Sequence, residues 1–136
     1  MQIGCGGRGE THLTEAIVSQ RQNLVALVDP ADHQIAGKQK WLQGKNVKTS
    51  DVQVFSDYRE MFDKIGKQVD AVFIATPNHH HCNAAMLALE AGKNVYCEKP
   101  LTHDIAEARK LREAAARHPK QATQMGNQGH CMDGSG

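Results

Sequence analysis

The sequence predicts an α/β fold in which helices cover both faces of a doubly wound parallel sheet. Two short apolar runs, at 24–28 and 71–75, have the length and character of strands buried on both faces. Segments with helical apolar spacing alternate with these runs. Repeated strand–helix units build parallel sheets, and 136 residues suffice for one such domain. We therefore predict a single domain.

The strands are placed by apolar segments that end in turn-forming residues. The first segment, 1–3, precedes a glycine-rich turn and is shorter than the about five or six residues of an average strand. We therefore expect the first strand to be shortened. The other strand candidates are 24–28, 52–55, 71–75, 94–97 and 121–125.

The helices are placed by apolar residues that recur every three or four positions. Asp57 is a candidate N-cap for one helix, and Asp104 for another. Gly92 is the candidate C′ glycine after a third helix, and Pro119 is expected to end the last helix. Trp41 is interpreted as packing a further helix onto the sheet. The helical segments are 13–20, 58–65, 84–91 and 105–115.

Composition and charge argue against several classes of partner. The chain has 16 Lys+Arg and 15 Asp+Glu, so it lacks the broad positive field that attracts nucleic acid or an anionic membrane. No apolar run approaches the roughly 20 residues that a membrane-spanning helix needs. The cysteines form no C-x-x-C pair and are interpreted as reduced thiols. They are Cys5, Cys82, Cys97 and Cys131.

A glycine-rich motif follows the first strand. The segment 4–9, GCGGRG, matches G-x-G-x-x-G, a weak signal by itself in a chain with 12 glycines. It lies between a short apolar segment and a helix-like one, and Asp29 ends the next strand twenty positions after Gly9. This context is typical of a Rossmann dinucleotide-binding unit. There Gly4 permits the tight turn, Gly6 lets a pyrophosphate approach the backbone, and Gly9 lets helix and strand pack closely.

Asp29 predicts the type of dinucleotide. An acidic residue at this position accepts hydrogen bonds from the adenosine ribose hydroxyls. Its charge repels a 2′-phosphate, and the nearby Asp32 adds to that repulsion. We therefore predict NAD as the cofactor, with NADP less favoured. The structural alternative is a glycine-rich turn with a capping aspartate.

Two further motifs follow neighbouring strands. The segment 76–81, TPNHHH, comes after the most apolar strand, and 98–100, EKP, comes after the next. Both are expected at the carboxyl edge of the sheet, where ligands bind. With the glycine motif and Asp29, they resemble the Gfo/Idh/MocA family of NAD(P)-dependent oxidoreductases over essentially the whole chain. The segment 124–130, QMGNQGH, resembles the exit from the last Rossmann strand in a bacterial subgroup of that family.

The resemblance implies a role for each matching position. The glycine loop with Arg8 would hold the pyrophosphate, and Asp29 the adenosine ribose. Lys99 would be catalytic, contacting the cofactor and the substrate oxygen, while Gln128 and His130 would border the substrate. The other implied cofactor ligands are Gly4, Gly6, Gly7, Gly9, Thr76, Pro77, Asn78, His81, Glu98 and Asn127.

A lysine suits the chemistry that the resemblance implies. Oxidation of a secondary alcohol removes a hydride and a proton, so the oxygen needs stabilisation while charge builds on it. An ammonium group can donate a hydrogen bond to that oxygen or exchange a proton with it. The alternative is that Lys99 caps a strand and pairs with Glu98 at the surface.

The histidines are not predicted to bind metal. Three adjacent histidines, 79–81, cannot easily all point at one ion, and no distant Cys-His pair completes a tetrahedral set. His81 is expected to face the cofactor and His79 to orient its loop. The histidines interpreted as surface or capping residues are His12, His33, His103 and His118.

The family resemblance also predicts the organisation of the protein. Residues 1–125 would form the dinucleotide-binding domain, and 126–136 an exit loop toward a C-terminal substrate domain that is absent from this chain. The substrate domain would also form the contacts of a homo-oligomer. This chain alone is expected to bind NAD weakly, with little turnover. Its predicted location is the cytoplasm, with export by a twin-arginine signal outside this chain as the alternative.

The implied activity is hydride transfer between the nicotinamide cofactor and a hydroxyl of a sugar or polyol, without nucleic acid or membrane partners. Two alternatives stay open. One is an NAD-dependent glycoside hydrolase of the same family type. The other is a module that binds a nucleotide without chemistry.

Overall fold

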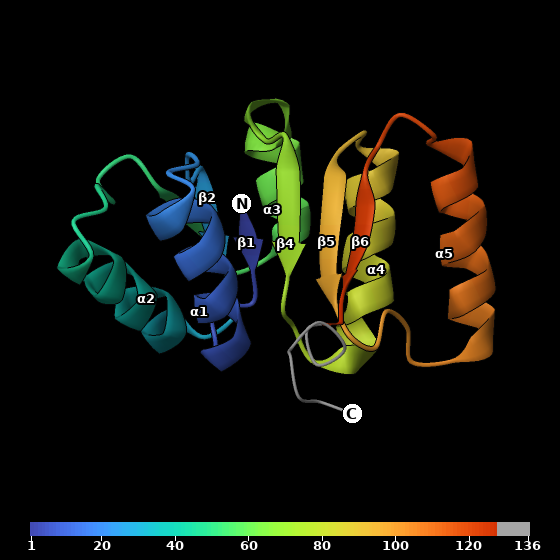
Figure 1. The fold of residues 1–136 in the computed structure, drawn as a ribbon, viewed down its shortest axis with the longest axis horizontal. Coiled ribbons are helices and arrows are strands. Elements are labelled where there is room, and N and C mark those ends of the chain that lie inside the picture. The colour runs from blue at the N-terminus through green and yellow to red at the C-terminus, as the bar shows by residue number, and fades with distance from the viewer. Residues whose placement is uncertain (128–136) are drawn as a thin grey trace.

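Parallel strands form the centre of the molecule. The structure is a computed structural model that describes residues 1–127. Within these residues, six strands form one all-parallel sheet in the order β3-β2-β1-β4-β5-β6 (Figure 1). This order confirms the doubly wound sheet, and its switch point lies between β1 and β4. The strands are β1 (Gln2–Ile3), β2 (Ala26–Val28), β3 (Gln53–Phe55), β4 (Ala71–Ile74), β5 (Asn94–Glu98) and β6 (Thr123–Gly126).

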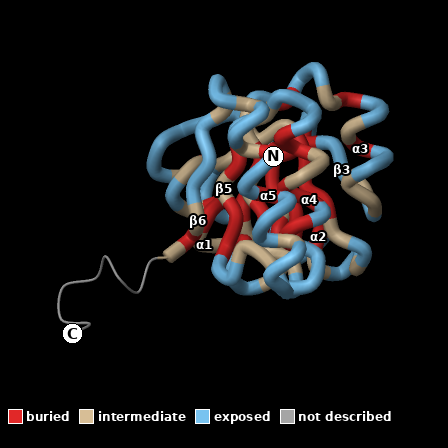
Figure 2. Tube along the Cα trace, turned by 90° about the vertical axis from the view of Figure 1, so that its right-hand side faces the viewer, coloured by how far each residue is buried: buried red, intermediate tan, exposed pale blue. Residues whose placement is uncertain are grey.

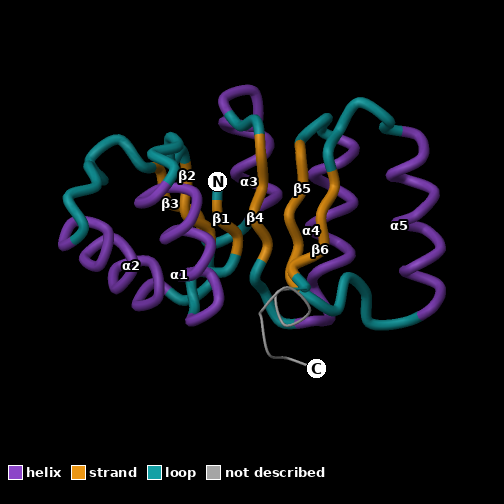
Figure 3. Tube along the Cα trace, in the orientation of Figure 1, coloured by secondary structure: helices purple, strands orange, loops and turns teal. Residues whose placement is uncertain are grey.

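Helices connect successive strands and pack on both faces of the sheet (Figures 1 and 3). The predicted first helix begins earlier than expected, directly in the glycine loop, and continues through a π-helical segment. The helices are α1 (Gly7–Leu13), η1 (Thr14–Ser19), α2 (Asp32–Gly44), α3 (Tyr58–Ile65), η2 (Gly66–Gln68), α4 (Asn78–Glu90) and α5 (Ile105–Arg117).

The sheet separates two apolar cores, as its strand pattern requires. Consecutive strand residues point to opposite faces, so Leu27 and Val28 of β2 enter different cores. Buried positions follow the strands and the inner sides of the helices (Figure 2). The core under α1, η1 and α2 consists of Cys5, Leu13, Ile17, Leu27, Ile35, Leu42 and Val52. The core under α3, α4 and α5 includes Ile3, Val28, Met61, Ile65, Val72, Ile74, Leu89 and Leu111.

The predicted helix ends are confirmed by their hydrogen bonds. Asp57 accepts a hydrogen bond from the Arg59 backbone N–H at 2.8 Å, and Asp104 accepts one from Glu107 at the same distance. Gly92 follows α4 with a φ of +74°, the left-handed conformation expected of a C′ glycine.

Apolar spacing in the sequence did not predict the bounds of helix α2. Trp41 packs against the core on this side, as predicted. Lys38, however, occupies a buried position on the same helix and pairs with Glu10 of α1 at 2.7 Å. A buried lysine weakens the apolar periodicity of α2, although its long aliphatic part contributes to packing. None of the helices within residues 1–127 combines the length and the apolar character of a membrane span.

Candidate functional site

The loops that carry the predicted site residues meet at one edge of the sheet. This is the carboxyl edge, at the bottom of Figures 1 and 3, where the strands run into the loops after β1, β2, β4 and β5. Two hollows open there. The larger hollow, of about 870 Å³, is lined by Gly4, Pro30, Tyr58, Thr76, Pro77 and residues of α3 and α4. The smaller hollow, of about 370 Å³, is lined by Arg8, Ala75, Thr76, Asn78, His81, Glu98 and Lys99.

Thr76 lines both hollows and so connects them. Its hydroxyl oxygen is buried and has no hydrogen-bond partner among residues 1–127. Buried polar atoms are normally hydrogen-bonded, so this hydroxyl is an exception, and its side chain would have to turn toward either hollow to reach a ligand.

The glycines of the loop divide into two pairs with different functions. A Cβ on Gly4, which has a φ of +85°, would lie 2.5 Å from the Ala75 carbonyl oxygen. A Cβ on Gly9 would collide with the Gly4 carbonyl oxygen. At Gly6 and Gly7, by contrast, an added Cβ meets no atom within 4 Å. Gly4 and Gly9 are therefore required by packing, whereas Gly6 and Gly7 keep a free surface over the loop.

Asp29 holds the glycine loop against the end of β2. One carboxylate oxygen accepts a hydrogen bond from the Cys5 backbone N–H at 2.8 Å, and the other accepts one from Ala31 at 2.9 Å. An ionised carboxylate offers about four acceptor positions, so two of them stay available to a ligand. The aspartate therefore stabilises the turn and can still accept ribose hydroxyls.

Lys99 and Glu98 point in different directions from the end of β5. Lys99 is exposed beside the smaller hollow, and within residues 1–127 its side chain makes no hydrogen bond or ion pair. Glu98 is buried, with only 4% of its surface exposed. The alternative in which these two residues pair at the surface is therefore wrong, because Glu98 is buried and its ion-pair partners are Arg8 and His12.

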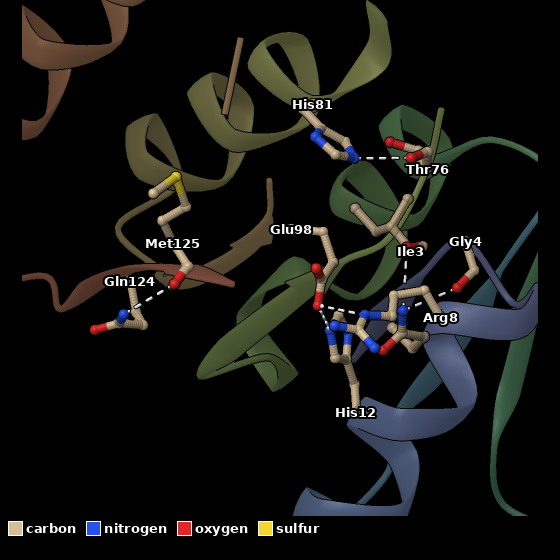
Figure 4. Close-up of polar contacts among 10 residues, drawn as sticks. Ile3, Gly4, Arg8, His12, Thr76, His81, Glu98, Gln124 and Met125 are labelled. Atoms are coloured by element: carbon tan, nitrogen blue, oxygen red, sulfur yellow. Dashed lines mark hydrogen bonds and ion pairs between the residues drawn. The ribbon is translucent and has the colours of Figure 1, made fainter. Parts of the chain in front are cut away.

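Glu98 instead contacts two residues of α1 (Figure 4). His12 Nε2 lies 2.8 Å from Glu98 Oε1, and Arg8 Nε lies 3.2 Å from the same oxygen. Gly126 lies behind the carboxylate, because a Cβ there would come within 2.8 Å of its carbon and of Oε1. The carboxylate is thus held from three sides.

The assignment of His12 to the surface was wrong. The residue is buried, with 4% exposure, and its ring packs against Tyr96 at 5.0 Å and Phe73 at 5.6 Å between centroids. The signal that could have found it is its spacing from Gly9. Because Gly9 must face the strand, the residue three positions later on the same helix also faces the sheet.

His81 lies at the smaller hollow with only 1% of its surface exposed. Its Nδ1 is 2.6 Å from the Pro100 carbonyl oxygen. Its Nε2 is 2.7 Å from the Thr76 carbonyl oxygen (Figure 4). His81 therefore ties the loop after β4 to the loop that follows Lys99. Its contact with a cofactor stays a prediction.

The remaining predicted residues occupy the rim of the site or lie beyond the described chain. Pro77 and Asn78 are exposed at the start of α4, next to an exposed His79. Asn127 follows β6, and its backbone N–H bonds the Met125 carbonyl at 3.0 Å. Gln128 and His130, the implied substrate residues, lie outside residues 1–127, as does Cys131.

The described cysteines are free thiols, as predicted, and they are buried. Burial, together with the neighbouring Asp29, raises the pKa of the Cys5 thiol to about 12. Burial, together with Glu98, does the same for Cys97. Thiolate is the reactive form, so neither residue is a nucleophile at this site. Within the described residues, no three His, Cys, Asp or Glu side chains group as metal ligands.

Comparison with known proteins decides the family. A family model described as "Oxidoreductase family, NAD-binding Rossmann fold" matches residues 2–126. The chain belongs to the Gfo/Idh/MocA family. This confirms the family predicted from the motifs, and a Gfo/Idh/MocA domain of this type is an NAD-binding Rossmann fold.

Similar proteins of the Gfo/Idh/MocA family cover much more sequence than this chain. Inositol 2-dehydrogenase/D-chiro-inositol 3-dehydrogenase of Shouchella clausii is 30% identical over 124 residues, which is 91% of this chain and 34% of that protein. D-xylose 1-dehydrogenase (NADP(+)) of Hypocrea jecorina is 49% identical over 65 residues, 48% of this chain and 16% of that protein. The chain thus spans about a third, or less, of the length of these relatives.

The fold is also similar to solved structures. Scyllo-inositol dehydrogenase from Lactobacillus casei, with bound NAD(H) and scyllo-inositol, matches with a TM-score of 0.80 and 28% identity. The match covers 97% of this chain and 36% of that one. Myo-inositol 2-dehydrogenase from Lactobacillus plantarum matches with a TM-score of 0.79 and 30% identity, covering 97% of this chain and 37% of that one.

Proposed function

We propose that this domain binds NAD along the carboxyl edge of its sheet and supplies Lys99 to a hydride transfer on a sugar or polyol. The observation that carries the proposal is the arrangement of the two hollows. The larger begins at the glycine loop, the smaller ends at Lys99, and Thr76 lines both. An elongated dinucleotide fits such a path better than a compact ligand does.

The residues at this edge fit NAD. The surface over Gly6 and Gly7 is free for a pyrophosphate, and α1 begins there with backbone N–H groups directed toward it. Arg8 has 47% of its side chain exposed at the same place. Thr76 lies where the two hollows meet, midway along the path. These features support placing the pyrophosphate across the loop.

Asp29 supports NAD over NADP. Its carboxylate is fixed by two backbone hydrogen bonds and so cannot easily turn away from a ligand. Ribose hydroxyls would donate to it, whereas a 2′-phosphate would place a second negative charge next to it. The relatives include both types by name, since one is called NADP(+)-dependent and another is bound to NAD(H).

Lys99 supports a role in chemistry. Bound NAD would accept the hydride, and the ammonium group of Lys99 would donate a hydrogen bond to the alcohol oxygen as charge develops there. The group is exposed at the smaller hollow and is engaged by no other residue of 1–127, so it is available for that contact. The pairing of Glu98 with α1 leaves Lys99 free in this way.

The choice among the three activities rests on the relatives. The relatives named above are dehydrogenases of inositols or xylose, which supports polyol or sugar oxidation rather than glycoside hydrolysis. We extend the proposal to the domain boundary near residue 125, to a homo-oligomer and to a cytoplasmic location. The buried free thiols are consistent with a reducing compartment.

The catalytic role is tested in an enzyme in which this domain replaces the matching third of inositol 2-dehydrogenase. NADH formation with myo-inositol should fall by about a hundredfold or more in Lys99→Met, within the usual range for acid–base groups. NAD affinity should change little. The matched control is Lys93→Met, because Lys93 precedes β5 at the opposite edge of the sheet. NADH formation unaffected by Lys99→Met would contradict the proposed role.

A further inference from the structure

We propose that His12 is a positioning residue, which orients the Glu98 carboxylate at the Lys99 end of the cofactor site. The inference rests on the proposed function, since it gives Glu98 a cofactor to contact. It concerns a histidine of the first helix that the family motifs quoted above do not include. The hydrogen bond between His12 and Glu98 joins the glycine-loop helix to the loop that carries Lys99.

The geometry fixes which way this hydrogen bond runs. A carboxylate oxygen only accepts, so a proton must lie on His12 Nε2, and in the uncharged ring Nδ1 is then unprotonated. That Nδ1 is buried and has no partner within the described residues. Tyr96 and Phe73 pack against the ring and hold its plane. His12 therefore has one orientation and one donor, and the donor points at Glu98.

The groups around His12 keep it uncharged. Burial lowers the pKa of the ring, against the opposite effect of the Glu98 carboxylate. Arg8, which faces the same carboxylate, lowers it further. A neutral donor leaves the negative charge of Glu98 in place, so the carboxylate can still accept hydroxyl groups of a ligand.

Arg8 and His12 have different freedom to move. The Arg8 side chain is 47% exposed and belongs to the loop that we propose binds the pyrophosphate. A phosphate can therefore draw Arg8 away from Glu98. The side chain of His12 is only 3% exposed and has no comparable freedom. His12 thus keeps Glu98 oriented in the bound state, when Arg8 is engaged elsewhere.

Stability alone does not explain this buried pair. The charge here is on Glu98, and apolar residues of similar size are often as stabilising as a buried charge with its partners or more so. The carboxylate also lines the smaller hollow beside Thr76 and Lys99, so it is held where a ligand would reach it. The structure therefore assigns His12 an effect on binding that is separate from its effect on folding.

Calorimetric titration with two ligands separates these effects. NAD reaches the Glu98 end of the site, whereas ADP lacks the nicotinamide ribose and does not. In His12→Leu, which removes the donor and keeps much of the bulk, NAD affinity should fall about tenfold while ADP affinity stays within about twofold. His12→Gln retains an amide donor and should recover most of the NAD affinity. His118→Gln, between α5 and β6 at the opposite edge of the sheet, is the matched control.

Each outcome decides a different claim. Equal loss of NAD and ADP affinity in His12→Leu, or no loss at all, overturns the positioning role but leaves the proposed function standing. Failure of the unsubstituted chain to bind NAD overturns both. A ¹⁵N NMR spectrum of the ring tests the pair without any ligand. We expect the Nε2–H form of His12 at neutral pH, and the Nδ1–H form would contradict the hydrogen bond to Glu98.

Discussion

Two substitutions in the glycine loop, Gly6→Ala and Gly9→Ala, separate effects on folding stability from effects on ligand binding. The two substitutions add the same methyl group to positions three residues apart. At Gly9 the methyl carbon would overlap the backbone carbonyl of Gly4, whereas at Gly6 it meets no atom within 4 Å. The structure therefore predicts opposite effects on stability and on ligand affinity.

The magnitudes follow from these two environments. Overpacking costs about 1–3 kcal/mol or more when backbone must move. The overlap at Gly9 is with backbone, so its cost lies in the upper part of this range, about 2–3 kcal/mol. Alanine in the helical position regains about 1 kcal/mol of helix propensity, so a net loss of about 1–2 kcal/mol remains. Gly6 is the N-cap of α1 with a φ of −66°, which alanine adopts freely. Alanine is a poorer N-cap than glycine by about 0.5–1 kcal/mol. This loss of stability is offset by a similar gain, because alanine lowers the conformational entropy of the unfolded chain.

Urea unfolding and NAD titration test both halves of this prediction. Gly9→Ala should lower the free energy of unfolding by about 1–2 kcal/mol. Gly6→Ala should leave it within about 0.5 kcal/mol yet weaken NAD binding at least about tenfold, because the methyl group occupies the surface that the pyrophosphate needs. Unchanged NAD affinity in a folded Gly6→Ala chain would refute this placement of the pyrophosphate.

Three other consequences concern buried groups. Folding lowers the pKa of His12, so the stability contributed by its uncharged ring should be fully present above the ordinary histidine pKa of about 6.5 and should be lost as the pH falls below it. Urea unfolding should show a smaller loss of stability at low pH in His12→Gln. An identical loss would contradict the burial effect. Cys5 and Cys97, with pKa values of about 12, should react with a thiol reagent near pH 8 about a thousandfold more slowly in the folded chain than in urea, and equal rates would contradict their burial. Gly126→Ala should displace Glu98 and cost about 1–3 kcal/mol, measured by urea unfolding, and unaltered stability would show that the carboxylate has room to move.

Local signals predicted the parts of the fold that depend on them. The apolar run at 71–75 was recognisable because β4 is buried on one face and partly buried on the other, and Asp57 and Asp104 cap helices as their side chains favour. The glycine motif gained meaning from its distance to Asp29, which the structure brings into contact with the loop. Each of these features is set by residues close in sequence or by a fixed strand–helix unit.

The parts that were missed depend on contacts between distant residues. His12 and Glu98 are 86 positions apart, and nothing in either local sequence indicates that they pair. Lys38 is buried through its contact with Glu10, so α2 lacked a clear apolar pattern. The close approach of Gly126 to Glu98 likewise arises only when β6 pairs with β5. Tertiary packing determines all three.

The central claim is that the glycine loop and Asp29 bind the adenosine half of NAD. The most direct measurement is calorimetric titration of the 136-residue chain with NAD and NADP, repeated for Asp29→Asn, with the exposed Asp63→Asn on α3 as the control. We expect NAD to bind more tightly than NADP, and Asp29→Asn to lose about tenfold in NAD affinity and most of the preference. Asp63→Asn should match the unsubstituted chain. A folded chain that does not bind NAD, or that binds it equally well in Asp29→Asn, would contradict the account.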